Sequence, residues 1–175
     1  MIARVTARLG KKIGVSPSHS LPVDANPYAD WSAHLFTVNR LQYILLTNTV
    51  SLYSIVIQAK GITSDRTFLS RMAREMGAFM RKDGHQLIYE RCVAPATEQV
   101  TFSKALSRAV TGSMNDLIFE AKCFLIDSEA SLCDVSLRLN ETPLAFLNYS
   151  FSREAFMAMT DASVMRQAGL KRGKK

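Results

Sequence analysis

The sequence predicts an α+β fold: an antiparallel β-meander of four or more strands covered by helices, in a single domain. Three apolar runs rich in β-branched and aromatic residues come before residue 59, and two long amphipathic patterns follow them. Strands followed by helices are the order typical of α+β proteins. With 175 residues, 47% of them hydrophobic, the chain is long enough to bury a core without a disulfide or a metal. We expect residues 1–168 to form the domain and residues 169–175 a basic, flexible tail.

The N-terminal segment predicts a strand, a short helix and a loop, in that order. Residues 1–8 alternate between two sets of side chains, which suits a strand, and residues 9–15 continue as a brief helix or turn. Residues 16–30 contain three prolines together with Ser, Asp and Asn, so we expect a connecting loop there.

Three successive strands form the predicted meander, over residues 31–38, 41–47 and 50–58. Asn39-Arg40 and Asn48-Thr49 separate them, and each pair is short enough for a two-residue hairpin turn. A turn at Asn39-Arg40 sets the register of the first hairpin, with the pairs Val38–Leu41, Phe36–Tyr43, His34–Leu45, Leu35–Ile44 and Ala33–Leu46. Both faces of the meander are then apolar, so we expect other elements to cover both.

A first long helix is predicted after Thr63 or Ser64, either of which suits the N-cap, and Gly84 marks its end. Its apolar residues share one arc: Phe68, Leu69, Met72, Met76, Phe79 and Met80. The opposite side is a candidate basic surface, formed by Arg71, Arg74, Arg81 and Lys82. Such a surface contacts phosphate groups in some proteins, but an ordinary solvated helix face explains it equally well.

A second long helix is predicted over residues 106–125, with one apolar stripe and a second, mixed stripe that includes Gly112 and Phe119. We therefore expect this helix to be buried on two sides. Weak helix formers occupy its middle, in the run Gly112-Ser113-Met114-Asn115-Asp116. Two explanations stay open: another segment packs closely at Gly112, or the polar groups of the run form part of a site.

Shorter elements complete the expected fold. They are a helix over residues 85–93, a strand over 99–102, a helix opened by Ser128 that ends before Pro143, a strand over 144–151 and a final helix capped by Ser152.

The positive charge of the chain is concentrated near its two ends. The formal net charge is +7, and the cations near the two ends have no acidic residue among them. The last of these cations form the basic tail: Lys171, Arg172, Lys174 and Lys175. A basic end neutralises phosphates of nucleic acid, although a solubilising tail is the simpler interpretation.

No apolar run approaches the roughly 18 residues of a membrane span and no secretory signal opens the chain, so we expect a cytoplasmic protein with no membrane partner.

The sequence contains no recognisable catalytic, metal or cofactor motif. Its three cysteines and three histidines lack the spacing of a zinc site, so we predict no metal and no cofactor and leave enzymatic activity open. His34 is either a base or ligand in a cleft or a neutral core histidine with one hydrogen bond. Asp116, four residues before Glu120, is either half of a carboxylate pair or a solvated acid.

Four runs together resemble a known family. They are Asp30-Trp31-Ser32-Ala33-His34-Leu35-Phe36, Leu45-Leu46-Thr47-Asn48, Gly112-Ser113-Met114-Asn115-Asp116 and Leu139-Asn140-Glu141-Thr142-Pro143. In this order they resemble an uncharacterised family of small bacterial proteins classed as a domain of unknown function. The resemblance spans nearly the whole chain and implies no activity, cofactor or substrate. His34 stands where the family pattern has Asn, which argues against a catalytic role for this histidine.

Three functional hypotheses follow. The first is a non-enzymatic binding or interaction module that contacts nucleic acid, or a protein partner, through basic termini. The alternative is a small enzyme whose pocket joins Trp31, His34 and Asn48 of the sheet to Asn115 and Asp116 of the second long helix, next to Gly112 and Ser113. The third is a homo-oligomer joined through the apolar strand at residues 50–58.

Overall fold

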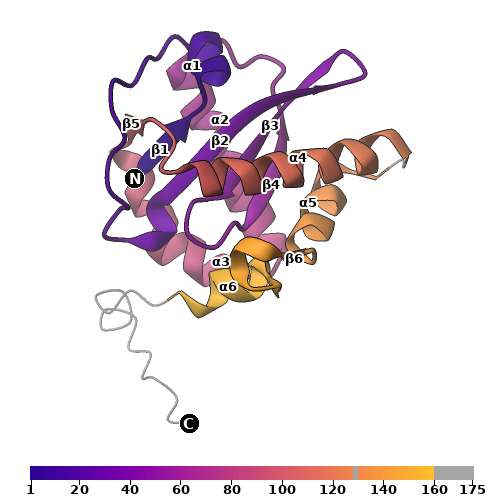
Figure 1. The fold of residues 1–175 in the computed structure, drawn as a ribbon. Coiled ribbons are helices and arrows are strands. Elements are labelled where there is room, and N and C mark those ends of the chain that lie inside the picture. The colour runs from indigo at the N-terminus through magenta and orange to yellow at the C-terminus, as the bar shows by residue number, and fades with distance from the viewer. Residues whose placement is uncertain (128–129, 160–175) are drawn as a thin grey trace, which may run out of the picture.

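Among the residues described, five strands form the main sheet, in the order β4-β3-β2-β1-β5 (Figure 1). The computed structural model describes residues 1–127 and 130–159. The strands are β1 (Ile2–Val5), β2 (Asp30–Val38), β3 (Leu41–Asn48), β4 (Ser54–Gln58) and β5 (Thr101–Ser103). β2, β3 and β4 pair antiparallel, whereas β1 pairs parallel with both β2 and β5. The α+β class is confirmed, but the sheet is mixed and not the simple antiparallel meander we predicted.

The parallel part of the sheet arises from a crossover. Helix α1 (Ala7–Ile13) and a loop that ends in the short 3-10 helix Pro27–Ala29 connect β1 to its neighbour β2. Parallel neighbours need such a connection, because a tight turn joins only antiparallel strands. Periodicity identifies a strand but not its partner, so the sequence pattern did not reveal this pairing.

The first hairpin has the register that the sequence predicts, including the pairs Val38–Leu41 and His34–Leu45. Asn39 and Arg40 have φ angles of 45° and 65°, the left-handed values that a tight hairpin turn requires. The second turn differs from the prediction. β4 begins at Ser54 and not at residue 50, because the side chain of Asn48 accepts hydrogen bonds from the amides of Val50 and Ser51 and holds a wider loop.

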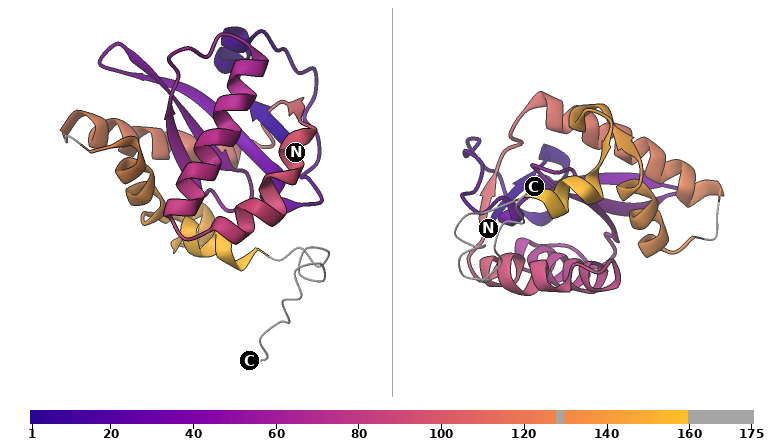
Figure 2. Two further views of the ribbon diagram at one scale, coloured as in Figure 1. Left: turned by 180° about the vertical axis from the view of Figure 1, so that it is seen from behind. Right: turned by 90° about the horizontal axis from the view of Figure 1, so that it is seen from below.

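Helices cover both faces of the sheet, as predicted (Figure 2). Helix α2 (Asp65–Lys82) packs on one face and begins at Ser64, whose hydroxyl accepts a hydrogen bond from the Thr67 amide. Helices α4 (Arg108–Asp127) and α5 (Leu132–Asn140) pack on the other face. Figure 1 shows α4 crossing in front of β2 and β3.

The expectation that the second long helix is buried on two sides was wrong. The side chain of Phe119 in α4 is 68% exposed, and Gly112 is exposed as well. The helix buries one stripe, including Met114 and Leu117, against the sheet, and α5 packs beside this stripe. One covering layer is enough for this face of the sheet, so the mixed stripe of α4 faces water.

The remaining elements connect these layers. They are helix α3 (Gln86–Ile88), the π-helix Tyr89–Val93, the 3-10 helices Pro95–Glu98 and Ala145–Leu147, strands β6 (Pro143–Leu144) and β7 (Ser150–Phe151), and helix α6 (Ser152–Ala158). The strand predicted over 144–151 is therefore a small hairpin, because Asn148 and Tyr149 adopt left-handed φ angles that reverse the chain. The N-cap of α5 is Ser131, and Ser128 lies outside the described residues, as does the tail at 169–175.

The outer edge of β4 is covered from within the chain. The amide side chain of Asn140 in α5 accepts a hydrogen bond from the Ser54 amide and donates one to the Ser54 carbonyl. The hydroxyl of Ser136 accepts a hydrogen bond from the Val56 amide. These side chains occupy backbone groups that a neighbouring strand would otherwise bind. An oligomer joined through this strand would have to displace them.

Candidate functional site

The structure separates the residues of the predicted pocket. Trp31 and His34 lie on opposite faces of β2, because side chains three positions apart in a strand point to opposite sides. Trp31 is 1% exposed, and its ring nitrogen donates a hydrogen bond to the Tyr28 carbonyl. Asn48 is fully buried and donates to the Pro27 carbonyl while its oxygen holds the loop before β4. Trp31 and Asn48 are therefore buried structural residues, and neither lines a cavity with His34.

Of the four candidate residues on α4, two line a cavity and two do not. The hydroxyl of Ser113 donates a hydrogen bond to the Ala109 carbonyl one turn earlier, and Asp116 is exposed. Gly112 and Asn115 line a cavity of about 450 Å³ together with Ser107. Asn115 also lines a second cavity with His34, so these two predicted residues are brought together.

The cavity at His34 lies between three elements. It has a volume of about 380 Å³, and its polar lining consists of Arg8 from α1, His34 and Thr37 from β2, and Asn115 and Lys122 from α4. Leu35, Phe36 and Ile118 form the rest of the wall. β1 ends at Val5, so the part of β2 beyond Ala33 has no neighbour on that side and is open to the cavity. The guanidinium of Arg8 donates a hydrogen bond to the Thr37 hydroxyl at 3.2 Å.

The surroundings of His34 keep its imidazole neutral. Burial, together with the positive charges of Arg8 and Lys122, holds the pKa of His34 below its ordinary value of about 6.5. Its Nδ1 atom is buried and has no hydrogen-bond partner among the described residues.

Two further cavities continue the series toward the carboxyl ends of β1 and β5. One has a volume of about 780 Å³ and is lined by Thr6, Lys11 and Lys104 among others. It shares Ala105 with the 450 Å³ cavity at Gly112, which shares Asn115 with the cavity at His34. The Thr6 hydroxyl oxygen is buried and has no hydrogen-bond partner within the described part of the chain.

Cations line all three cavities, and no carboxylate does. They are Arg8, Lys11, Lys104, Arg108 and Lys122, which we call the basic rim. In residues 1–127 and 130–159, none of these five side chains forms an ion pair. A concave surface lined by charge of one sign concentrates its field and attracts counter-ions.

The start of α4 adds to this positive potential. Its first turn contains Arg108 and no acidic residue, although acidic residues are favoured there because the helix dipole makes this end positive. The Ser107 hydroxyl accepts a hydrogen bond from the Val110 amide and so caps the helix. Placing a cation at this end is locally unfavourable, and it adds to the positive potential of the cavity at Gly112.

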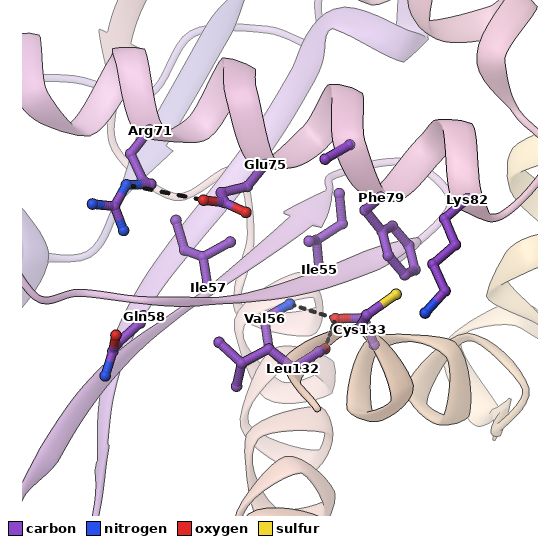
Figure 3. Close-up of a pocket in the computed structure, with 12 residues that line it drawn as sticks. Ile55, Val56, Ile57, Gln58, Arg71, Glu75, Phe79, Lys82, Leu132 and Cys133 are labelled. Atoms are coloured by element: carbon purple, nitrogen blue, oxygen red, sulfur yellow. Dashed lines mark hydrogen bonds and ion pairs between the residues drawn. The ribbon is translucent and has the colours of Figure 1, made fainter. Parts of the chain in front are cut away.

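The basic surface predicted on α2 is different, because its cations have partners; Figure 3 marks the pair of Arg71 with Glu75. Arg71 and Arg74 both pair with Glu75, at 4.0 and 2.6 Å. The guanidinium of Arg81 lies over the ring of Tyr89, at 5.9 Å from its centre. Lys82 is 4.0 Å from Asp134, and a hydrogen bond with Cys133 raises its pKa. Lys171, Arg172, Lys174 and Lys175 lie outside the described residues.

Figure 3 also shows what lies beside this helix face. A cavity of about 380 Å³ between β4, α2 and α5 is mainly apolar, with Ile55, Phe79 and Leu132 in its wall. Its charged residues are the Arg71–Glu75 pair and Lys82, which are already engaged. Within the described ranges, no group of three or more side chains is arranged to hold a metal ion, and no helix has the length and apolar character of a membrane span.

Gly112 provides a prediction about stability. A Cβ atom at this position would meet nothing within 4 Å, so close packing does not explain the glycine. We expect Gly112→Ala to raise the free energy of unfolding by about 0.5–1 kcal/mol, because alanine is the better helix former. Urea denaturation measures the change.

Gly77→Ala in α2 is the matched comparison. There a Cβ atom would lie 2.7 Å from the ring of Tyr89, so this variant should lose about 1–3 kcal/mol. Destabilisation by Gly112→Ala as well would show that Gly112 is needed for packing, contrary to the structure.

Sequence reasoning overlooked most of the basic rim. Its residues come from three segments, 8–11, 104–108 and 122, which no short motif joins. The one local signal was Lys104 and Arg108 around the start of a helix, against the preference set by the helix dipole. The convergence of these segments depends on the parallel pairing of β1 with β2 and β5.

Comparison with known proteins gives one match. Residues 2–155 match the model of a family described as Domain of unknown function (DUF6933). No curated protein and no solved structure matches the chain.

Proposed function

Since the chain belongs to the DUF6933 family, a domain of unknown function, we propose a function from its own geometry: it is a non-enzymatic module that binds nucleic acid through the phosphate backbone. The observation that carries the proposal is the basic rim, five cations around three adjoining cavities whose lining contains no carboxylate. The contact surface is thus the edge at the carboxyl ends of β1 and β5, and not the α2 face.

The chemistry of the lining favours phosphate over other partners. An acidic protein surface would present carboxylates at scattered positions, whereas a nucleic-acid strand presents one phosphate after another to neighbouring cations. The aromatic side chains near the rim do not favour base stacking, because Phe36 is 3% exposed and stacks on Tyr43. Binding through phosphates is expected to depend strongly on salt and weakly on base sequence.

A salt series tests the proposal. We expect the protein to bind short single-stranded RNA and DNA in a fluorescence anisotropy titration. The logarithm of the association constant should fall linearly with the logarithm of salt concentration, with a slope of about −0.7 for each phosphate contacted, or about −3.5 for five contacts. The double variant Lys104→Gln/Arg108→Gln removes two contacts, so its slope should be shallower by about 1.4.

The matched control is Arg71→Gln/Arg74→Gln, which removes the same number of charges from α2. These two arginines share Glu75, so the salt slope should stay close to that of the unmodified protein. Undetectable binding at low salt, or equal effects of the two double variants, would contradict the proposed surface.

A further inference from the structure

The cavity at His34 differs from the rest of the basic rim, because an arginine, a lysine, a histidine and an asparagine line the same recess. We propose that this cavity receives the terminal phosphate of a nucleic-acid strand, a phosphomonoester. The inference rests on the proposed function and names the group that the cavity selects. Arg8 and Lys122 approach from α1 and α4, and His34 and Asn115 lie in the wall between them.

Charge distinguishes a terminal phosphate from an internal one. A phosphomonoester carries a charge of about −1.5 to −2 at pH 7, whereas each internal phosphodiester carries one negative charge. Arg8 and Lys122 supply two positive charges to the cavity, and its lining holds no acidic side chain. The recess therefore matches a dianion better than a monoanion.

The hydrogen-bond donors of the cavity match the oxygen atoms that a phosphomonoester has free and a phosphodiester does not. The Arg8 guanidinium is held at the cavity by its hydrogen bond to Thr37, which leaves its other N–H groups free to donate to a ligand. The Asn115 amide is a further donor, and the neutral ring of His34 in the cavity wall carries one N–H group. A volume of about 380 Å³ is near the lower end for ligand pockets, so it accommodates one terminal nucleotide and not a longer segment.

Binding should change the protonation of His34. The charged groups that face His34 are Arg8 from α1 and Lys122 from α4, and both disfavour the imidazolium. A bound dianion offsets their charge and favours the protonated ring. The pKa of His34, which lies below its ordinary value in the free protein, should therefore rise when the cavity is filled.

The experiment compares one oligonucleotide sequence with different ends. Anisotropy titrations at fixed salt use strands with a 5′-phosphate, a 3′-phosphate or hydroxyl groups at both ends. We expect one of the two phosphorylated strands to bind about tenfold or more tightly than the hydroxyl strand. Arg8→Gln and Lys122→Gln should abolish this preference, whereas Lys104→Gln, outside the cavity, should weaken all three strands equally and keep the preference.

Each other outcome is informative. Salt-dependent binding without any preference between ends overturns this inference and leaves the proposed function standing, whereas absence of all binding overturns both. If inorganic phosphate or a mononucleotide binds as tightly as the phosphorylated strand, the ligand is a small phosphate compound. That result overturns the proposal that the cavity receives the end of a nucleic-acid strand.

Nuclear magnetic resonance of the His34 ring gives an independent readout on the folded protein. The pKa of His34 should rise on addition of the preferred phosphorylated strand and remain unchanged with the hydroxyl strand. The Lys122→Gln protein should show a higher pKa of His34 before any addition, which also confirms that the variant is folded. An unchanged pKa on binding places the phosphate elsewhere.

Discussion

Replacement of Arg4 with alanine is expected to cost about 3–5 kcal/mol of the free energy of unfolding. Arg4 is 1% exposed and forms a two-point ion pair with Asp30, at 2.7 Å from Nε to Oδ1 and 2.8 Å from Nη2 to Oδ2. It also donates hydrogen bonds to the carbonyls of Leu21 and Pro22, both at 2.9 Å. Its removal leaves the fully buried carboxylate of Asp30 without its counter-ion and releases the loop between α1 and β2.

Urea denaturation measures this loss, with Arg8→Ala as the control. Arg8 is exposed, so its replacement should change stability by less than about 0.5 kcal/mol. The double variant Arg4→Met/Asp30→Leu should be more stable than Arg4→Ala, because it leaves no buried charge without a partner. Equal stability of Arg4→Ala and Arg8→Ala would refute the structural role of this ion pair.

Asp83, directly after α2, is the second position with a large expected effect. The hydroxyl of the fully buried Tyr53 donates to its Oδ2 at 2.6 Å, and His85 Nε2 lies 3.2 Å from the same oxygen. Arg153 of α6 lies 3.0 Å from Oδ1 and donates to the Asp83 carbonyl. Asp83→Ala should cost about 3 kcal/mol, since the buried Tyr53 hydroxyl loses its acceptor and Arg153 loses its ion-pair partner. Tyr53→Phe, which removes one hydrogen bond, should cost about half as much.

The contribution of Asp83 should depend on pH in a defined direction. Burial alone would raise the pKa of Asp83, but hydrogen bonds from His85 and Tyr53 and the charge of Arg153 outweigh it and hold the pKa below its ordinary value of 3.8. A lowered pKa in the folded state stabilises the protein above the unfolded pKa, and the stabilisation is lost as the pH falls through the folded pKa. The stability difference between the unmodified protein and Asp83→Asn should therefore be constant near neutrality and shrink in acid. A difference that grows below pH 3.8 would contradict this assignment.

The candidate site shows where prediction from the sequence stopped. His34 and Asn115 were identified as candidates, and they do share a cavity. Trp31 and Asn48 were grouped with them because they are polar or aromatic residues near the same strands, but alternation along β2 puts Trp31 on the opposite face. Of the cations that define the basic rim, Arg8 and Lys11 were visible only as part of the excess of charge near the N-terminus, and Lys104, Arg108 and Lys122 were not identified.

The sequence by itself determined the local elements of this protein. The register of the hairpin at Asn39-Arg40 follows from a two-residue turn, and α2 follows from its apolar period and the cap at Ser64. Both depend on interactions between residues close in the chain, which a linear pattern records. Only the tertiary structure decided that β1 lies parallel between β2 and β5, that α4 buries a single stripe, and that Arg8 of α1 and Lys122 of α4 line one cavity. These features depend on which distant surfaces pack together, and the free energy of that packing is shared among many residues and is not carried by any one motif.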